Sequence, residues 1–144
     1  MESKTAEEKQ SSVASQSKTD EQPVALLLYT DLMFGVELQS MARKAGFRFM
    51  NLRPGVAVPE GDVLVVDMAA RGDWQGAIRE AHERGIAVVA FGSHTDTEAR
   101  RAAKNAGAGR VLANSNLARD LPGILVEIRQ RRDESTGEGT NGAD

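Results

Sequence analysis

Carboxylates carry whatever chemistry this sequence can offer, because the chain has no cysteine and only two histidines. The absence of cysteine excludes a disulfide framework, a zinc knuckle, an iron–sulfur site and a thiol nucleophile, and two histidines leave little for a metal cluster. Two aspartates stand out by position: Asp67 ends the unbroken apolar run 63–66, and Asp31 follows the apolar run 24–29. What these two acids can do depends on the elements that bring them together.

Alternating sequence patterns predict those elements. Short apolar runs are typical of strands buried on both faces, and apolar spacings of three and four residues are typical of helices that bury one face. The predicted strands cover 24–29, 47–52, 63–66, 86–91 and 110–113, and the predicted helices cover 34–45, 74–84, 95–106 and a last helix from near residue 120. Between residues 53 and 62, prolines and glycines indicate a loop, so a second helix is reduced or missing.

Three residues set the expected helix starts. Asp73 is a plausible N-cap for the helix that follows it, and the spacing from Thr95 to Glu98 matches a capping box. Pro122 fits only the first turn of the last helix, because proline in a helix interior removes a hydrogen bond. The expected start near residue 120 depends on that proline.

The alternation of strands and helices predicts an α/β fold: a three-layer α/β/α sandwich around a five-stranded parallel sheet. The expected strand order is 2-1-3-4-5, in which the order reverses between strands 1 and 3. A small site should then form beyond the carboxyl ends of these two strands, where Asp31 and Asp67 lie.

The two ends of the chain differ in composition from its middle. Residues 1–22 are polar and residues 133–144 are acidic and glycine-rich, so we expect two disordered tails around one domain at 23–132. The tails hold three of the 18 basic and nine of the 21 acidic residues, which leaves 15 and 12 in the domain. This weak positive charge argues against a nucleic-acid partner. No signal peptide or membrane span is visible, so we expect a cytoplasmic protein without a membrane partner.

Over residues 23–130, the sequence resembles the receiver domain of bacterial two-component response regulators, a CheY-like domain with a flavodoxin-like fold. Residues 62–68 (DVLVVDM) resemble the third receiver strand with its phospho-accepting aspartate, which the resemblance places at Asp67. Residues 106–113 (AGAGRVLA) resemble the stretch from helix 4 into strand 5. A receiver site also needs neighbouring acids for Mg²⁺, a hydroxyl on strand 4 and a lysine on strand 5.

The first two of these further requirements are met in part. Where paired acids are expected, the chain has Thr30 and Asp31, so Asp31 and Asp67 are the candidate ligands of a weak Mg²⁺ site, and no other cofactor is implied. Gly92 occupies the hydroxyl position, with Ser93 and His94 directly after it. Adjacent residues on a turn point apart, so we expect no direct chemical role for a pair of Ser93 and His94.

The lysine position holds Asn114, which decides the interpretation. An acyl phosphate beside two carboxylates needs a fixed cation, which an amide cannot supply. We therefore expect a degenerate receiver, or pseudo-receiver: a non-enzymatic signalling module that acts in trans through protein contacts. In the plainer interpretation of the two acids, Asp67 bonds nearby backbone N–H groups and Asp31 caps a helix.

Two alternatives to the degenerate receiver stay open. The chain could be a working single-domain response regulator of a phosphorelay, phosphorylated on Asp67 by a histidine kinase. It could also be a flavodoxin-like binder of a small ligand between strands 1 and 3, although no glycine-rich phosphate loop follows the first strand.

The predicted fourth helix supplies a candidate interaction face. Its exposed side carries Arg100, Arg101 and Lys104, which is either an ordinary solvated face or a contact for an acidic partner such as the C-terminal tail. The resemblance implies protein partners, for example a histidine kinase or an output protein, and leaves a homodimer open.

Overall fold

The computed structural model describes the backbone of residues 22–142 and the side chains of residues 22–135. Of the predicted N-terminal tail, residues 1–21 lie outside this range. Five strands form one parallel sheet in the order β2-β1-β3-β4-β5. They are β1 (Val24–Leu28), β2 (Arg48–Leu52), β3 (Val63–Asp67), β4 (Ala87–Gly92) and β5 (Arg110–Ala113). The predicted sheet and its order are confirmed.

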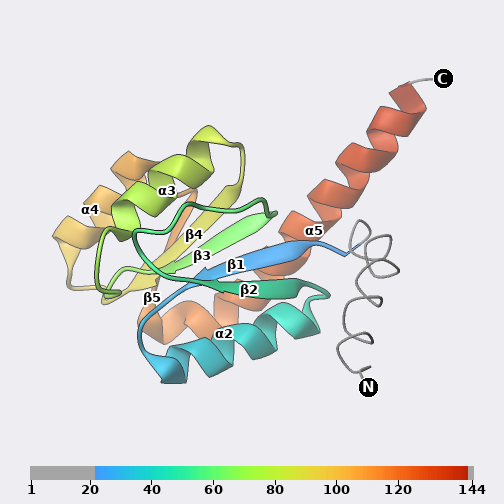
Figure 1. Cartoon of the computed structure of the whole chain (residues 1–144). Helices are drawn as coiled ribbons and strands as arrows, with labels where there is room; N and C mark the ends of the chain where they lie inside the picture. The colour runs from blue at the N-terminus through green and yellow to red at the C-terminus, as the bar shows by residue number, and fades with distance from the viewer. Residues whose placement is uncertain (1–21, 143–144) are drawn as a thin grey trace, which may run out of the picture.

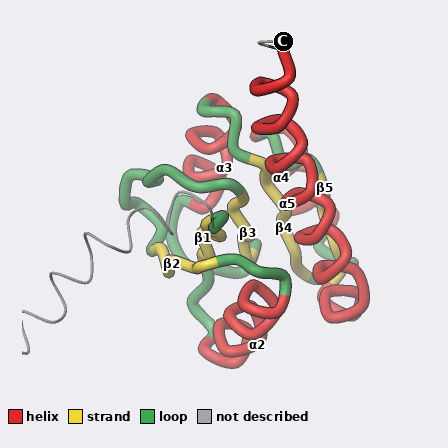
Figure 2. Tube along the Cα trace, turned by 90° about the vertical axis from the view of Figure 1, so that its right-hand side faces the viewer, coloured by secondary structure: helices red, strands yellow, loops and turns green. Residues whose placement is uncertain are grey.

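Helices cover both faces of this sheet, as Figures 1 and 2 show. Four α-helices lie in the described range, together with the 3-10 turn η1 (Asn114–Asn116). They are α2 (Leu32–Lys44), α3 (Trp74–Glu83), α4 (Thr97–Ala106) and α5 (Leu117–Gly142). The segment between β2 and β3 has no helix, as the sequence predicts. None of the described helices combines the length and hydropathy that a membrane span requires.

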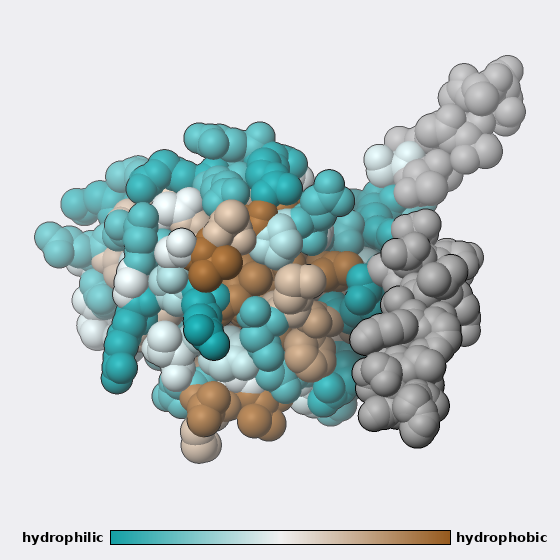
Figure 3. Space-filling model, in the orientation of Figure 1, coloured by the Kyte–Doolittle hydropathy of each residue, from teal (hydrophilic) through white to brown (hydrophobic). Residues whose placement is uncertain are grey.

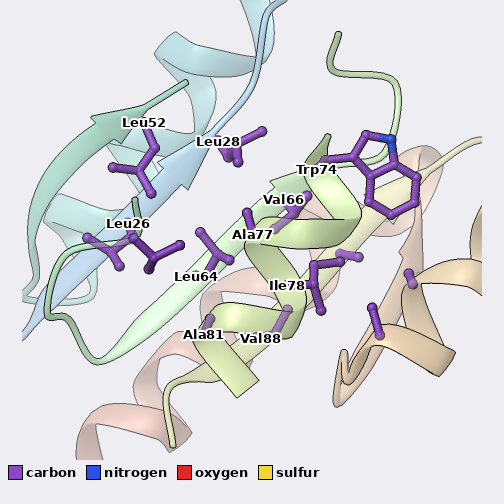
Figure 4. Packing of buried hydrophobic residues seen from close by; sticks show 14 of the residues in the cluster. Leu26, Leu28, Leu52, Leu64, Val66, Trp74, Ala77, Ile78, Ala81 and Val88 are labelled. Carbon is purple, nitrogen blue, oxygen red and sulfur yellow. The ribbon is translucent and has the colours of Figure 1, made fainter. Parts of the chain in front are cut away.

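The sheet separates two apolar clusters. On one face, α3 and α4 cover alternate residues of the central strands, and Figure 4 shows Ile78 and Ala81 of α3 over Leu64 and Val66 of β3. On the other face, α2 and α5 pack on the remaining alternate residues. Every residue of β3 is buried, as a strand covered on both faces requires. The carboxyl ends of the strands are therefore held in fixed positions.

Aspartate side chains cap three helices and so fix where they begin. Asp31, Asp73 and Asp96 accept hydrogen bonds from the backbone N–H groups of Met33, Gly76 and Ala99. The cap expected at Asp73 is confirmed. The capping box expected at Thr95 is wrong, because Asp96, one residue later, caps α4. An ionised carboxylate at this position also favours the positive end of the helix dipole.

The last helix differs from its prediction at both ends. It begins at Leu117, so Pro122 lies inside it and leaves the carbonyl of Ala118 without its helical N–H donor. Ala118 is exposed, so water can take the place of that donor. At the other end, the helix continues to Gly142, where we expected a disordered tail from residue 133. The ion pair of Asp133 with Arg129, four residues earlier, supports the helix past the domain body.

Candidate functional site

The candidate site residues lie at or directly after the carboxyl ends of β1, β3, β4 and β5. In a parallel sheet these ends share one edge, which is on the left in Figure 1. Register places Asp67 beside Phe91, and the next residue of β4, Gly92, beside Ala113 at the end of β5. The fold thus gathers the segments that contain Asp31, Asp67, Gly92 and Asn114 at this carboxyl edge.

Asp67 is 2% exposed and is the only charged side chain that is buried among the described residues. Its Oδ1 accepts a hydrogen bond from the backbone N–H of Ala69 at 2.8 Å. Within the described range, its carboxylate has no other hydrogen bond and no ion pair. The carboxylate therefore performs the plainer of its two expected roles, which is to hold the turn after β3.

Burial raises the pKa of Asp67 above its ordinary value, because an apolar environment disfavours the charged form. The bond from Ala69 lowers the pKa in part, and the negative charge of Asp31 raises it further. The two carboxylates are thus close enough to repel each other. No cation offsets this repulsion, since no lysine or arginine pairs with Asp67 in the described part of the chain.

Asp31 is exposed, and one of its oxygens is used at the start of α2. Its Oδ1 accepts the backbone N–H of Met33 at 2.9 Å, as expected of a helix cap. Thr30, beside it, is also exposed and makes no side-chain hydrogen bond to any described residue. No group of three or more acidic, histidine or cysteine side chains that could hold a metal occurs among the described residues. The donor set for Mg²⁺ is therefore poor.

The hydroxyl position at the end of β4 is crowded by the side chain of Met68, which would have to shift to admit a Cβ. A Cβ at Gly92 would lie 2.7 Å from Cε of Met68 and 3.2 Å from its Cβ, both too close for ordinary contact. The hydroxyl of the next residue, Ser93, hydrogen-bonds that of Thr95 at 2.9 Å and accepts the N–H of Thr95 at 3.3 Å. His94 is exposed and has no hydrogen-bond partner within the described range. The Ser93 hydroxyl is therefore held in a turn.

The position of the expected lysine is occupied by Asn114, an exposed residue at the start of η1. The two described lysines, Lys44 and Lys104, lie in the last turns of α2 and α4. Each of these helices returns the chain to the amino edge of the sheet, so both lysines lie away from the carboxyl edge (Figure 1). Neither can supply the missing cation.

Met68 is the residue of this edge that sequence reasoning missed. Its backbone N–H donates to the carbonyl of Phe91, which fixes it beside Gly92 on the neighbouring strand. The sequence did contain a signal for this contact. A large flexible side chain directly follows the candidate phospho-acceptor, and a glycine ends the next strand. Large and small residues at facing positions are typical of close packing.

Comparison with known proteins gives a match at the level of structure only. No family model matches the sequence, and no curated protein matches it. A receiver domain protein from Methanospirillum hungatei is 13% identical with a TM-score of 0.66, covering 79% of this chain and 98% of its own. A receiver domain protein from Clostridium thermocellum is 16% identical with a TM-score of 0.63, covering 77% and 97%.

A third solved structure bears on the chemistry of the edge. It is the receiver domain of a sensor histidine kinase from Pseudomonas aeruginosa, 19% identical with a TM-score of 0.65, covering 76% of this chain and 98% of its own. This chain has the fold of a response regulator receiver domain. The Pseudomonas structure holds a magnesium ion in its active-site cleft, whereas the receiver fold of this chain offers few ligands for one.

Proposed function

We propose that this receiver-fold chain is a non-enzymatic signalling module that works without phosphorylation, through contacts with other proteins in the cytoplasm. One observation carries the proposal: the buried carboxylate of Asp67 has no compensating cation among the described residues. Burial raises the pKa of Asp67, so the charged form, which is the nucleophile and the metal ligand, is less favoured here than on an exposed carboxylate.

Electrostatics disfavour the phosphorylated product as well. An acyl phosphate at Asp67 would carry about two negative charges. The charge of Asp31 already opposes the single negative charge of the Asp67 carboxylate. Receiver chemistry balances these charges with an ammonium group, and Asn114 presents only an amide dipole at that position. Since the same charge is worth far more in a dry pocket than in water, the lost cation is a large loss.

The arrangement around Gly92 removes a second stabilising contact. A hydroxyl-bearing side chain there would have to displace Met68 before it could reach a phosphoryl oxygen. Without a cation or hydroxyl that binds the phosphoryl group, phosphorylation of Asp67 would not be coupled to a conformational change. The unmodified surface is then what partners recognise.

The residues present fit Mg²⁺ badly. Mg²⁺ demands near-octahedral oxygen geometry and keeps waters around one or two carboxylates. Here one oxygen of Asp31 is engaged by the cap of α2, and one of Asp67 by the turn after β3. No step of the proposed function uses a metal.

A working receiver phosphorylated on Asp67 is the second candidate. It is favoured by the position of Asp67 at the end of β3 and by the interaction of its charge with that of Asp31. A degenerate receiver would have both features as well. The two candidate functions are therefore distinguished only by whether Asp67 accepts a phosphoryl group.

The separating experiment incubates the full chain with Mg²⁺ and acetyl phosphate and follows its intact mass. We expect no added phosphoryl group, in parallel with the variant Asp67→Asn. A matched variant that combines Thr30→Asp, Met68→Ala, Gly92→Thr and Asn114→Lys should gain modification, because it restores the acid, the space, the hydroxyl and the cation. Stable modification of the natural sequence that Asp67→Asn abolishes would overturn the proposal.

A further inference from the structure

The connection between β2 and β3 covers the sheet less completely than the other connections do. Within residues 22–142, each other pair of consecutive strands is joined by α2, α3 or α4, whereas residues 53–62 cross the sheet as a loop. Met50 of β2 and Val56 of this loop are 43% and 55% exposed, and Figure 3 shows apolar surface in the middle of the face, between α3 and α2. The missing helix therefore leaves part of β1 and β2 uncovered.

A hollow of about 540 Å³ opens where this loop ends, over the first residues of β1 and β2. We call it the amino-edge hollow, because it lies at the edge of the sheet opposite to the one that carries Asp67 and Asn114. Arginines, acids and an amide dominate its lining, which includes Gln22, Arg48, Glu60, Asp62, Arg84 and Arg132. The hollow is thus polar and separate from the candidate site.

Hydrogen bonds hold the walls of the amino-edge hollow in place. Asp62 accepts the backbone N–H of Val24 at 2.8 Å through Oδ2 and the Nε of Arg132 at 3.2 Å through Oδ1. On the opposite wall, Arg84 donates to the backbone carbonyl of Val58. Because these contacts join the loop to β1, α3 and α5, the hollow keeps its shape.

Two charged side chains of the hollow are not used in this way. Arg48, at the start of β2, and Glu60, near the end of the loop, are exposed and have no side-chain hydrogen bond or ion pair with any described residue. The backbone N–H of Arg48 donates to the carbonyl of Pro23 at 2.9 Å, so the start of β2 is fixed beside the residues that precede β1. An occupant with both a carboxylate and an ammonium group would match this pair.

The chain itself delivers such groups to the hollow. Gln22 lines the hollow, and residues 18–21, Lys-Thr-Asp-Glu, come directly before it. Since consecutive Cα atoms are about 3.8 Å apart, the Cα atoms of Asp20 and Glu21 lie within about 8 Å of that of Gln22. Covalent connection thus brings two carboxylates to the rim, with the ammonium group of Lys18 two residues further on.

We propose that residues 18–21 of this chain occupy the amino-edge hollow, with the acidic pair Asp20 and Glu21 against Arg48 and the ammonium of Lys18 against Glu60. Arginine binds a carboxylate in two parallel hydrogen bonds. An exposed ion pair contributes little by itself, but a segment tethered at the rim has an effective concentration in the millimolar range.

This inference goes beyond the proposed function, because it concerns a contact within the chain instead of a contact with a partner. The N-terminal segment then supplies part of the cover that the missing helix leaves out. The disordered tail that composition predicts for residues 1–22 would end at residue 17.

Other occupants match the hollow less well. An apolar ligand would remove water from Arg48 and Glu60 without replacing their hydrogen bonds. The helix α5 passes the hollow at Arg132, but Figure 1 shows its end projecting away from the domain, so residues 136–142 are directed elsewhere. A second copy of the chain offers the same residues without the advantage of the tether.

The test uses NMR of the ¹⁵N-labelled full chain and measures the backbone order parameters of residues 18–21. Arg48→Gln removes the cation of the hollow. Arg53→Gln, directly after β2 and outside the hollow, is its matched control. Sedimentation of each variant reports association, and thermal unfolding checks that the fold is intact.

A second pair of variants changes the segment instead of the hollow. Asp20→Asn combined with Glu21→Gln removes the acidic pair, and the Nε–Hε signal of Arg48 reports whether the guanidinium loses its partner. Glu7→Gln combined with Glu8→Gln is the matched control, because it removes the same charge from outside residues 18–21.

We expect order parameters of about 0.85 for residues 18–21 in the natural sequence, and below about 0.6 in Arg48→Gln and in the variant without the acidic pair. Both controls should keep the natural values, and salt at about 1 M should lower them. The Nε–Hε signal of Arg48 should shift when the acidic pair is removed and stay in place in its control.

Three results would overturn the inference. They are order parameters below about 0.6 in the natural sequence, equal responses of the variants and their controls, and a dimer that Arg48→Gln dissociates, which would assign the hollow to a second copy. None of these results involves phosphorylation of Asp67, so the proposed function is tested separately.

Discussion

Two regions of this domain hold charge that nothing nearby balances, and they differ in access. At the carboxyl edge, the carboxylate of Asp67 is 2% exposed and has no cation beside it. On α4, Arg100 has one buried donor without an acceptor, but its neighbours Arg101 and Lys104 are exposed. The carboxylate of Asp67 is enclosed and is repelled by the charge of Asp31. The guanidinium of Arg100 lies at the margin of an open face.

The difference shows how burial decides what an unbalanced charge can do. Burial disfavours the charged form of an enclosed carboxylate and so raises its pKa. A cation on an open face can instead recruit an anion from outside. The same receiver fold therefore separates a buried, charge-poor edge from an open charged surface. Substitutions at four places test this contrast.

The largest effect should come from Gly92→Thr, which forces a side chain into the space of Met68. Overpacking of this kind costs about 1–3 kcal/mol in the free energy of unfolding. Urea denaturation measures it, and Gly109→Thr is the matched control, because a Cβ at Gly109 meets only the carbonyl oxygen of Val88 at an ordinary 3.7 Å. The cost should shrink in a Met68→Ala background. An equal cost in both backgrounds would show that Met68 does not close the position.

Replacing the enclosed carboxylate should stabilise the protein. Because the folded state binds the proton of Asp67 more tightly than the unfolded state does, this residue's favourable contribution is present below its ordinary pKa of 3.8 and is lost as the pH rises through the raised folded value. Asp67→Asn should therefore gain on the order of 1 kcal/mol at neutral pH, and little at acid pH. Denaturant unfolding across this pH range measures the difference. A variant less stable at neutral pH would mean that a cation supports the carboxylate.

Asp31 should behave as a helix cap. Asp31→Ala removes the acceptor for the N–H of Met33 and should cost about 1 kcal/mol, whereas Asp31→Asn keeps an acceptor and should cost little. Thermal unfolding of the two variants, with and without Mg²⁺, makes the comparison. A stabilisation by Mg²⁺ that both variants lose would assign Asp31 to a metal instead.

The smallest change in stability should follow from removing the α4 cations. Substituting Arg100 and Lys104 with glutamine relieves a repulsion between like charges and should change the stability by only about 0.5 kcal/mol. Arg132→Gln, which breaks the ion pair to Asp62 at 3.2 Å, provides the contrast and should cost more. A large loss from the α4 substitutions would give those cations a structural role.

The sequence predicted the architecture well because the information was local. Unbroken apolar runs identified buried strands such as 63–66, and the prolines and glycines at 53–62 showed that a helix is missing between β2 and β3. The cap at Asp73 was equally readable, because an N-cap acts within three residues of the chain.

Contacts between distant segments could not be read in the same way. The closure of Gly92 by Met68 depends on the register of β3 against β4, which no local pattern specifies. The unpartnered guanidinium nitrogen of Arg100 is likewise a property of how α4 sits on its neighbours. The continuation of α5 past residue 132 was missed because an acidic, glycine-rich composition outweighed the pairing of Asp133 with Arg129.

The most direct test of the closed edge is an NMR titration of the ¹⁵N-labelled chain with Mg²⁺ and beryllofluoride, which mimics an acyl phosphate. We expect no saturable shift in the amide signals of Asp31, Asp67 and Ala69. Saturable shifts at these residues, absent from Asp67→Asn, would show that the edge accepts a phosphoryl group and would contradict the central claim.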